Sequence, residues 1–190
     1  MAMNPEDLLR AIAAMRGDAV CVPTMTTVPA WRTIAPDDLS VVCVGFMGGA
    51  SSLGLGLALA RPDRRVIVFD GDGSLLMQLG SLATVAAAQP RNLVHLVFKN
   101  GVYQTSGAQE IPGGLQVDFV AMAKAAGYRE AYALADLDAF RRRFPATLRE
   151  EGPVLIELST GLAEQTPMTA PGGTPFSQQV EELRGKLRGL

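Results

Sequence analysis

The stretch Asp70, Gly71, Asp72, Gly73 directly follows the apolar residues 66–69, and carboxylates at the end of a buried strand need a chemical reason. The glycines let the backbone turn and approach a ligand, and N–H groups from Gly73 onwards can bind an anion at a helix start. A carboxylate at Asp72 would repel a phosphate unless a hard cation lay between them. Because Mg²⁺ combines one or two protein oxygens with phosphate oxygens, the pattern predicts Asp72 as a metal ligand. Asp70 is expected to make a local hydrogen bond.

A second oxygen ligand is expected at the end of the neighbouring strand. The apolar run at residues 92–98 leads into Asn100 and Gly101, and 26 residues, 74–99, separate Asn100 from Gly73. In a parallel sheet, ligands bind outside the carboxyl ends of the strands. Asn100 would therefore offer an uncharged oxygen close to Asp72.

The elements that position these residues can be predicted from the apolar pattern. Short β-branched runs, typical of strands, lie at residues 19–23, 40–46, 65–70, 92–98 and 153–159. A helix begins at Pro5 behind a possible Asn4 cap, and further helical stretches lie at 48–60, 74–88, 119–126 and 137–144. Continuous apolar strands between helices indicate an α/β fold with a doubly wound, mostly parallel sheet and helices on both faces. We expect one domain over residues 1–163, then an extended tail and short charged helix over 164–190.

Composition excludes several classes of function. The net charge is −2, and 48% of the residues are hydrophobic. The sequence shows no basic patch of the kind that would predict nucleic-acid binding. No leader sequence and no apolar run of membrane-spanning length is found, which makes the cytoplasm the expected compartment. Cys21 and Cys43 lie in apolar surroundings and are expected to be reduced core residues.

The Gly-Asp-Gly-Ser segment, followed at this spacing by Asn100, resembles the thiamine diphosphate enzymes. This resemblance implies that Asp72, the Asn100 side chain and the Val102 carbonyl bind Mg²⁺, while the backbone at Gly73, Ser74 and Gly101 contacts the diphosphate. The family often has Asn-Asn where this chain has Lys99-Asn100. The candidate cofactor-binding residues are Gly45, Met47, Gly71, Asp72, Gly73, Ser74, Asn100, Gly101, Val102 and Tyr103. Tyr103 could line the site or pack on the sheet edge.

The glycine-rich residues 44–60 resemble the family's segment for the aminopyrimidine end of the cofactor. In the family, a bulky apolar residue about 25 positions before the metal-binding Asp forces the cofactor into its bent shape, and Met47 lies 25 positions before Asp72. The Gly45 carbonyl would accept a hydrogen bond from the 4′-amino group. Met47 and Gly45 are thus expected to act on the reacting end of the cofactor.

Within the family, residues 74–86 and 100–109 look most like the sulfopyruvate decarboxylase β subunit and the C-terminal part of phosphonopyruvate decarboxylase, although Gln104, Thr105 and Ser106 depart slightly from that pattern. The resemblance implies decarboxylation of a small 2-oxo acid. Such enzymes also need a pyrimidine-binding domain whose Glu activates the cofactor, and no acidic motif here provides it. We therefore expect a split, hetero-oligomeric enzyme whose partner subunit supplies that Glu. The small-residue helix 48–60 would suit that interface or internal packing equally.

Two other functions remain open at this stage. The chain could be half of a carboligase of the acetolactate synthase type, or a regulatory module that binds thiamine diphosphate without turnover. Thr24, Thr26 and Thr27 could reach the diphosphate or form a polar turn. His95, inside an apolar strand, is expected to be a core residue with satisfied hydrogen bonds rather than a base.

Overall fold

The computed structural model describes residues 2–36, 39–43, 47–164 and 174–188, which form an α/β fold around a five-stranded parallel sheet. The strand order is β1-β2-β3-β7-β6, and every pair of neighbours is parallel. The predicted fold class is confirmed. The strands are β1 (Val20–Pro23), β2 (Val66–Gly71), β3 (Leu93–Lys99), β6 (Glu130–Leu134) and β7 (Val154–Ser159).

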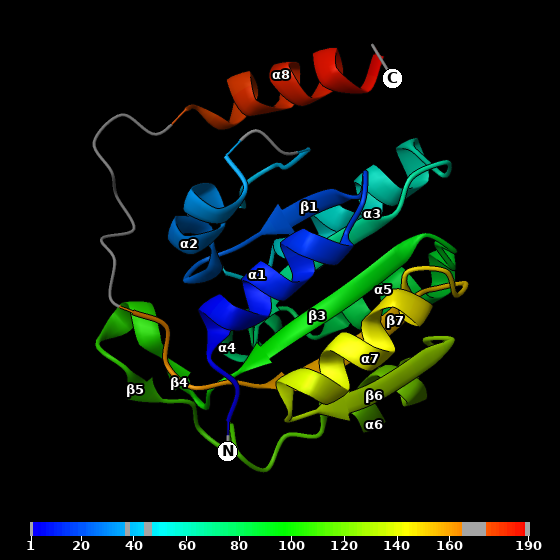
Figure 1. Cartoon of the computed structure of the whole chain (residues 1–190). Coiled ribbons are helices and arrows are strands. Elements are labelled where there is room, and N and C mark those ends of the chain that lie inside the picture. The colour runs from blue at the N-terminus through cyan, green and yellow to red at the C-terminus, as the bar shows by residue number, and fades with distance from the viewer. Residues whose placement is uncertain (1, 37–38, 44–46, 165–173, 189–190) are drawn as a thin grey trace.

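Helices cover both faces of the sheet, as Figure 1 shows. One apolar cluster joins alternate strand residues such as Ile67 and Leu96 to α1 (Pro5–Met15), α2 (Thr27–Ile34) and α7 (Leu137–Thr147). The other cluster joins Val68 and Val97 to α3 (Ala50–Ala60), α5 (Gly80–Ala88) and α6 (Phe119–Ala126). Successive strand residues point to opposite faces, so strands that are apolar at most positions supply both clusters.

Three sequence expectations need correction. Residues 40–43 make only isolated bridges, at Ser40 and Cys43, and 44–46 lie outside the described residues. The helix expected at 74–88 is two helices, α4 (Asp72–Leu76) and α5. The pattern also missed α2 and the edge strand β6, together with a small hairpin. That hairpin consists of β4 (Val102–Tyr103), the 3-10 turn Gln104–Ser106 and β5 (Gln109–Glu110).

The charged helix expected near the C-terminus is α8 (Phe176–Arg188). Leu183 of α8 is buried in the cluster that contains α3. Its ends are also anchored, because Arg61 Nη1 donates to the Leu187 carbonyl at 3.0 Å and Gln179 Oε1 accepts the Val42 N–H at 3.0 Å. The connecting residues 165–173 lie outside the described residues, so the division at residue 163 stays a prediction.

Two further expectations concern burial. Cys21 and Cys43 are both buried in the core, as expected. Helix α3 packs inward through Ala50, Gly54 and Ala58 and leaves Leu59 57% exposed, so internal packing accounts for one side of this helix. No helix in the described ranges is both long enough and apolar enough to cross a membrane.

Candidate cofactor site

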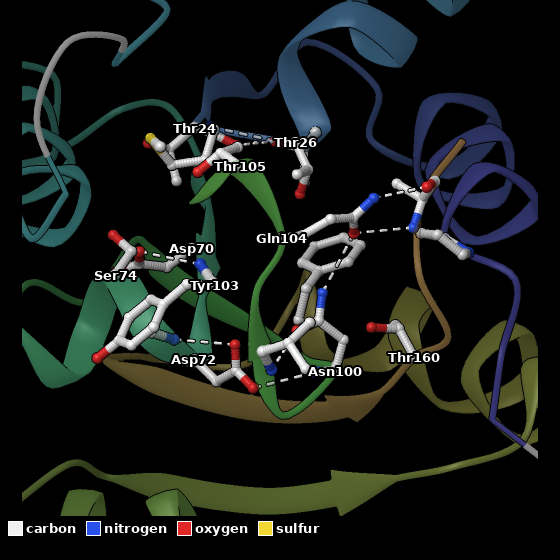
Figure 2. Close-up of a pocket in the computed structure, with 18 of the residues that line it drawn as sticks. Thr24, Thr26, Asp70, Asp72, Ser74, Asn100, Tyr103, Gln104, Thr105 and Thr160 are labelled. Atoms are coloured by element: carbon white, nitrogen blue, oxygen red, sulfur yellow. Dashed lines mark hydrogen bonds between the residues drawn. The ribbon is translucent and has the colours of Figure 1, made fainter. Parts of the chain in front are cut away.

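A pocket lies at the edge where β1, β2 and β3 end (Figure 2). Parallel strands deliver their carboxyl ends to the same edge, so loops distant in sequence meet here. Among the predicted site residues, the pocket is lined by Met47, Gly71, Asp72, Gly73, Ser74, Asn100, Val102 and Tyr103. Gly101 adjoins it through hydrogen bonds to Asp72, whereas Gly45 lies outside the described residues.

Asp72 is the centre of the hydrogen bonding at this edge. Its Oδ2 accepts the N–H groups of Asn100 at 3.0 Å and Gly101 at 2.7 Å, and its Oδ1 accepts the N–H of Gly73 at 2.8 Å. Burial raises the pKa of the Asp72 carboxyl, and these N–H donors oppose that rise. By accepting the N–H groups of Asn100 and Gly101, the Asp72 carboxylate fixes the place where the chain leaves β3.

Asn100 and Val102 belong to the same hydrogen-bonded unit. Asn100 Oδ1 accepts the Val102 N–H at 3.0 Å, and Gly101 between them adopts φ +78°, a conformation that favours glycine. One carboxylate, one amide oxygen and one main-chain carbonyl are the hard donors that Mg²⁺ takes when phosphate oxygens complete its shell. The described residues contain no cluster of three His, Cys, Asp or Glu side chains able to hold a metal by itself. The donor set therefore fits a cation shared with a phosphate ligand.

Gly73 is required by a close approach of Tyr103. A Cβ at position 73 would lie 2.6 Å from Tyr103 Cε1, so the tyrosine ring occupies the space that any larger residue would need. Tyr103 thus lines the pocket, the first of the two alternatives for this residue, and its ring packs on α4 at Gly73. The contact holds the β4 hairpin against the start of α4.

Met47 lines the pocket from the segment that precedes α3. The next residue, Gly48, donates its N–H to Ser74 Oγ at 3.0 Å and has φ +90°. A Cβ on Gly48 would lie 2.8 Å from Gln78 Cβ. The glycine therefore permits the approach that brings Met47 to the lining of the pocket.

The threonines after β1 line the pocket, and two of them also make hydrogen bonds within the protein. Thr24 Oγ1 donates to the Cys43 carbonyl at 2.7 Å, which ties the segment after β1 to residue 43, and Thr27 Oγ1 donates to the Thr24 carbonyl at 2.7 Å across the turn that leads into α2. Thr24, Thr26 and Thr27 all line the pocket. The polar-turn interpretation holds for Thr24 and Thr27.

Sequence reasoning missed several residues that line the pocket, among them Glu6, Gln104, Thr105 and Thr160. Glu6 belongs to the first turn of α1, and Thr160 follows β7. The strand order, which sets the end of β7 beside β3, was the missing information.

Beneath the site, Asp70 enters a buried polar network. Its Oδ1 accepts the Gly71 N–H at 3.0 Å, the local bond that was expected, and its Oδ2 lies 3.2 Å from His95 Nε2. His95 Nδ1 lies 3.2 Å from the Tyr128 hydroxyl, and burial, followed by the nearby Asp70 charge, raises the pKa of Tyr128. Asp70 and His95 are fully buried, so His95 is a core residue with both ring nitrogens in hydrogen bonds.

Comparisons with known proteins agree with this architecture. Residues 24–158 match the model for the thiamine pyrophosphate enzyme C-terminal TPP binding domain, thiamine pyrophosphate being thiamine diphosphate. A solved thiamine diphosphate-dependent 4-hydroxybenzoylformate decarboxylase from Rhodococcus jostii superposes with a TM-score of 0.72 at 24% identity, covering 86% of this chain and 34% of that one. This likeness shows the fold. The sheet and the pocket at its edge therefore form a thiamine diphosphate-binding domain.

Two curated relatives are closer in sequence. The phosphonopyruvate decarboxylase of Streptomyces viridochromogenes is 43% identical over 80% of this chain, which spans 38% of that protein. The sulfopyruvate decarboxylase subunit beta of Methanothermobacter thermautotrophicus is 37% identical over 75% of this chain and 74% of its own length. The chain belongs to the thiamine pyrophosphate enzyme family, whose cofactors are thiamine diphosphate and Mg²⁺.

Proposed function

We propose that this chain is the Mg²⁺-diphosphate-anchoring subunit of a split, two-chain decarboxylase that acts on a small 2-oxo acid of the sulfopyruvate or phosphonopyruvate type. The observation that carries the proposal is the hydrogen-bonded unit of Asp72, Asn100 and Val102 at the shared end of β2 and β3. The names of the two curated relatives support the substrate class. The name of the second relative, a subunit beta, supports a partner chain.

In this proposal, each residue has a defined task. Asp72, the Asn100 side chain and the Val102 carbonyl hold Mg²⁺, and the backbone at Gly73, Ser74 and Gly101 contacts the diphosphate. Gly71 allows the close backbone approach, and Tyr103 walls the pocket over Gly73. Met47 enforces the bent shape of the cofactor, and the Gly45 carbonyl accepts its amino group. The bound cofactor supplies the electron sink for loss of CO₂ from the 2-oxo acid.

The task left to the partner is proton transfer at the aminopyrimidine. The acidic side chains that line the pocket in the described part of the chain have other partners in this proposal: Asp70 bonds His95, Asp72 holds the metal, and Glu6 Oε2 lies 3.9 Å from Arg10 Nη2. A pyrimidine-domain subunit would bring the activating Glu from outside this chain. The exposed side of α3 around Leu59 is a surface available to such a subunit.

Native mass spectrometry of the tagged chain, purified from its own host with thiamine diphosphate and Mg²⁺, tests the assembly. We expect one stoichiometric partner chain and bound cofactor, and CO₂ release when the complex receives sulfopyruvate or phosphonopyruvate. Release of a condensed hydroxyketone product would instead identify a carboligase. Bound cofactor without any partner or turnover would identify a binding module and overturn the proposal.

A further inference from the structure

The Gln104 side chain bridges two loops that meet at the pocket. Its Nε2 donates to the Ala163 carbonyl at 2.6 Å, and its Oε1 accepts the Ala163 N–H at 3.1 Å. The same Oε1 accepts from Asn100 Nδ2 at 3.4 Å (Figure 2). One amide thus connects the segment after β7 with the proposed metal ligand Asn100.

Strand geometry explains why such a bridge is needed. The last ladder bond between β3 and β7 runs from the Thr160 N–H to the Lys99 carbonyl at 3.0 Å. After this bond, β3 turns away at Gly101. The segment after β7 pairs with Met3, whose carbonyl accepts the Gly161 N–H at 2.9 Å, and then continues to Ala163. The Gln104 amide pairs with both polar groups of Ala163, as a strand backbone would.

These bonds also determine which way each amide faces. An amide oxygen and nitrogen can be exchanged by a flip, and the hydrogen-bond partners decide between the two orientations. At Ala163 a main-chain N–H can only donate and a carbonyl can only accept, so Gln104 has one satisfactory orientation. Gln104 then offers an acceptor to Asn100, which directs Nδ2 towards Gln104, while Oδ1 accepts the Val102 N–H.

We infer that Gln104 is a positioning residue for metal binding. By accepting from Asn100 Nδ2, it keeps Asn100 Oδ1 on the side of Asp72 and Val102, where a cation would be held. The inference rests on the proposed function, because it assumes that Asn100 is a ligand. Residues that orient metal ligands commonly change metal affinity by about 10- to 100-fold when they are replaced.

The test is a comparison of two substitutions, alone and together, in the full chain with any copurifying partner. Mn²⁺ replaces Mg²⁺ as an oxygen-seeking probe, and the loss of the free Mn²⁺ paramagnetic resonance signal with thiamine diphosphate present reports affinity. Gln104→Met removes both hydrogen-bonding functions at nearly equal length. Asn100→Asp keeps an oxygen ligand but has no N–H to donate to Gln104.

We expect Gln104→Met to weaken Mn²⁺ binding by about tenfold in the natural background and to cause no further loss beside Asn100→Asp. Ser106→Ala, an exposed change in the same 3-10 turn, should leave affinity unchanged. Gln104→Ala repeats the comparison if the methionine variant does not fold. An equal loss of Mn²⁺ affinity with and without Asn100→Asp, or no loss when Asn100 is unchanged, would overturn this inference but not the proposed function. Absence of Mn²⁺ binding to the unaltered chain with thiamine diphosphate would overturn the proposed function and the inference with it.

Discussion

Ser74 Oγ accepts the Gly48 N–H at 3.0 Å, which ties the segment carrying Met47 to the helix that begins at Asp72. The proposed metal ligand and the proposed cofactor wedge therefore belong to one rigid arrangement. A displacement of the start of α4 would move both.

Met47→Ala should lower turnover more than thiamine diphosphate affinity. The side chain is proposed to shape the cofactor, whereas the affinity comes mainly from the metal and the diphosphate. Steady-state kinetics with cofactor titration measures both effects. Met77→Ala is the matched control, because Met77 is 50% exposed and is not among the residues that line the pocket. Unchanged turnover in the Met47 variant would remove Met47 from the role of wedge.

Asp72→Asn should abolish Mg²⁺-dependent binding of thiamine diphosphate, and Asn100→Ala should weaken it strongly. An amide at position 72 loses the charge that attracts the cation and also turns an N–H₂ group towards backbone N–H donors. Isothermal titration calorimetry with and without Mg²⁺ measures the effect. Asp138→Asn, an exposed change on α7, serves as the control. Metal-dependent binding of normal strength in the Asp72 variant would refute the ligand assignment.

Two glycines of α3 should respond oppositely to alanine. A Cβ at Gly54 would collide with Val68 Cγ2, so Gly54→Ala should destabilise the fold by about 1–3 kcal/mol. Gly56 is exposed with nothing within 4 Å, so Gly56→Ala should stabilise the helix by about 0.5–1 kcal/mol. Urea unfolding gives both free energies. Equal effects at the two positions would contradict the packing of α3 on β2.

The buried network beneath the site should contribute to stability in steps. Tyr128→Phe removes one partner of His95 and should cost about 1 kcal/mol. His95→Leu should cost more, about 2–4 kcal/mol, because it also leaves the buried Asp70 carboxyl without its ring partner. Denaturant unfolding measures both. A smaller loss for His95→Leu than for Tyr128→Phe would show that Asp70 does not depend on the ring.

Local patterns predicted much of this molecule because they record local physics. Apolar runs marked β2, β3 and β7 to within about one residue, and Asn4 caps α1 as expected, accepting the N–H groups of Glu6 and Asp7. The spacing from Asp72 to Asn100 predicted that both would lie at one edge. That expectation depended only on the two strands being parallel neighbours.

What the sequence did not show depends on distant contacts. Helix α2 contains Pro29 and starts among threonines, so its local pattern favoured a turn, yet Trp31 is buried against Phe69 with ring centroids 4.7 Å apart. The role of Gln104 requires Ala163, 59 positions away, which no short window includes. Residues 41–43 are apolar, but the segment 40–43 pairs only through single bridges, so hydrophobicity overstated its strand character.

The strand order also has a consequence for synthesis of the chain. Among the strands that the structure describes, β7 is made last, yet it inserts between β3 and β6, and β6 pairs with β7 alone. Until Val154–Ser159 leaves the ribosome, a nascent chain exposes the apolar edge of β3 with its unpaired backbone groups, a known template for aggregation. A truncation before Val154 should therefore yield insoluble chains.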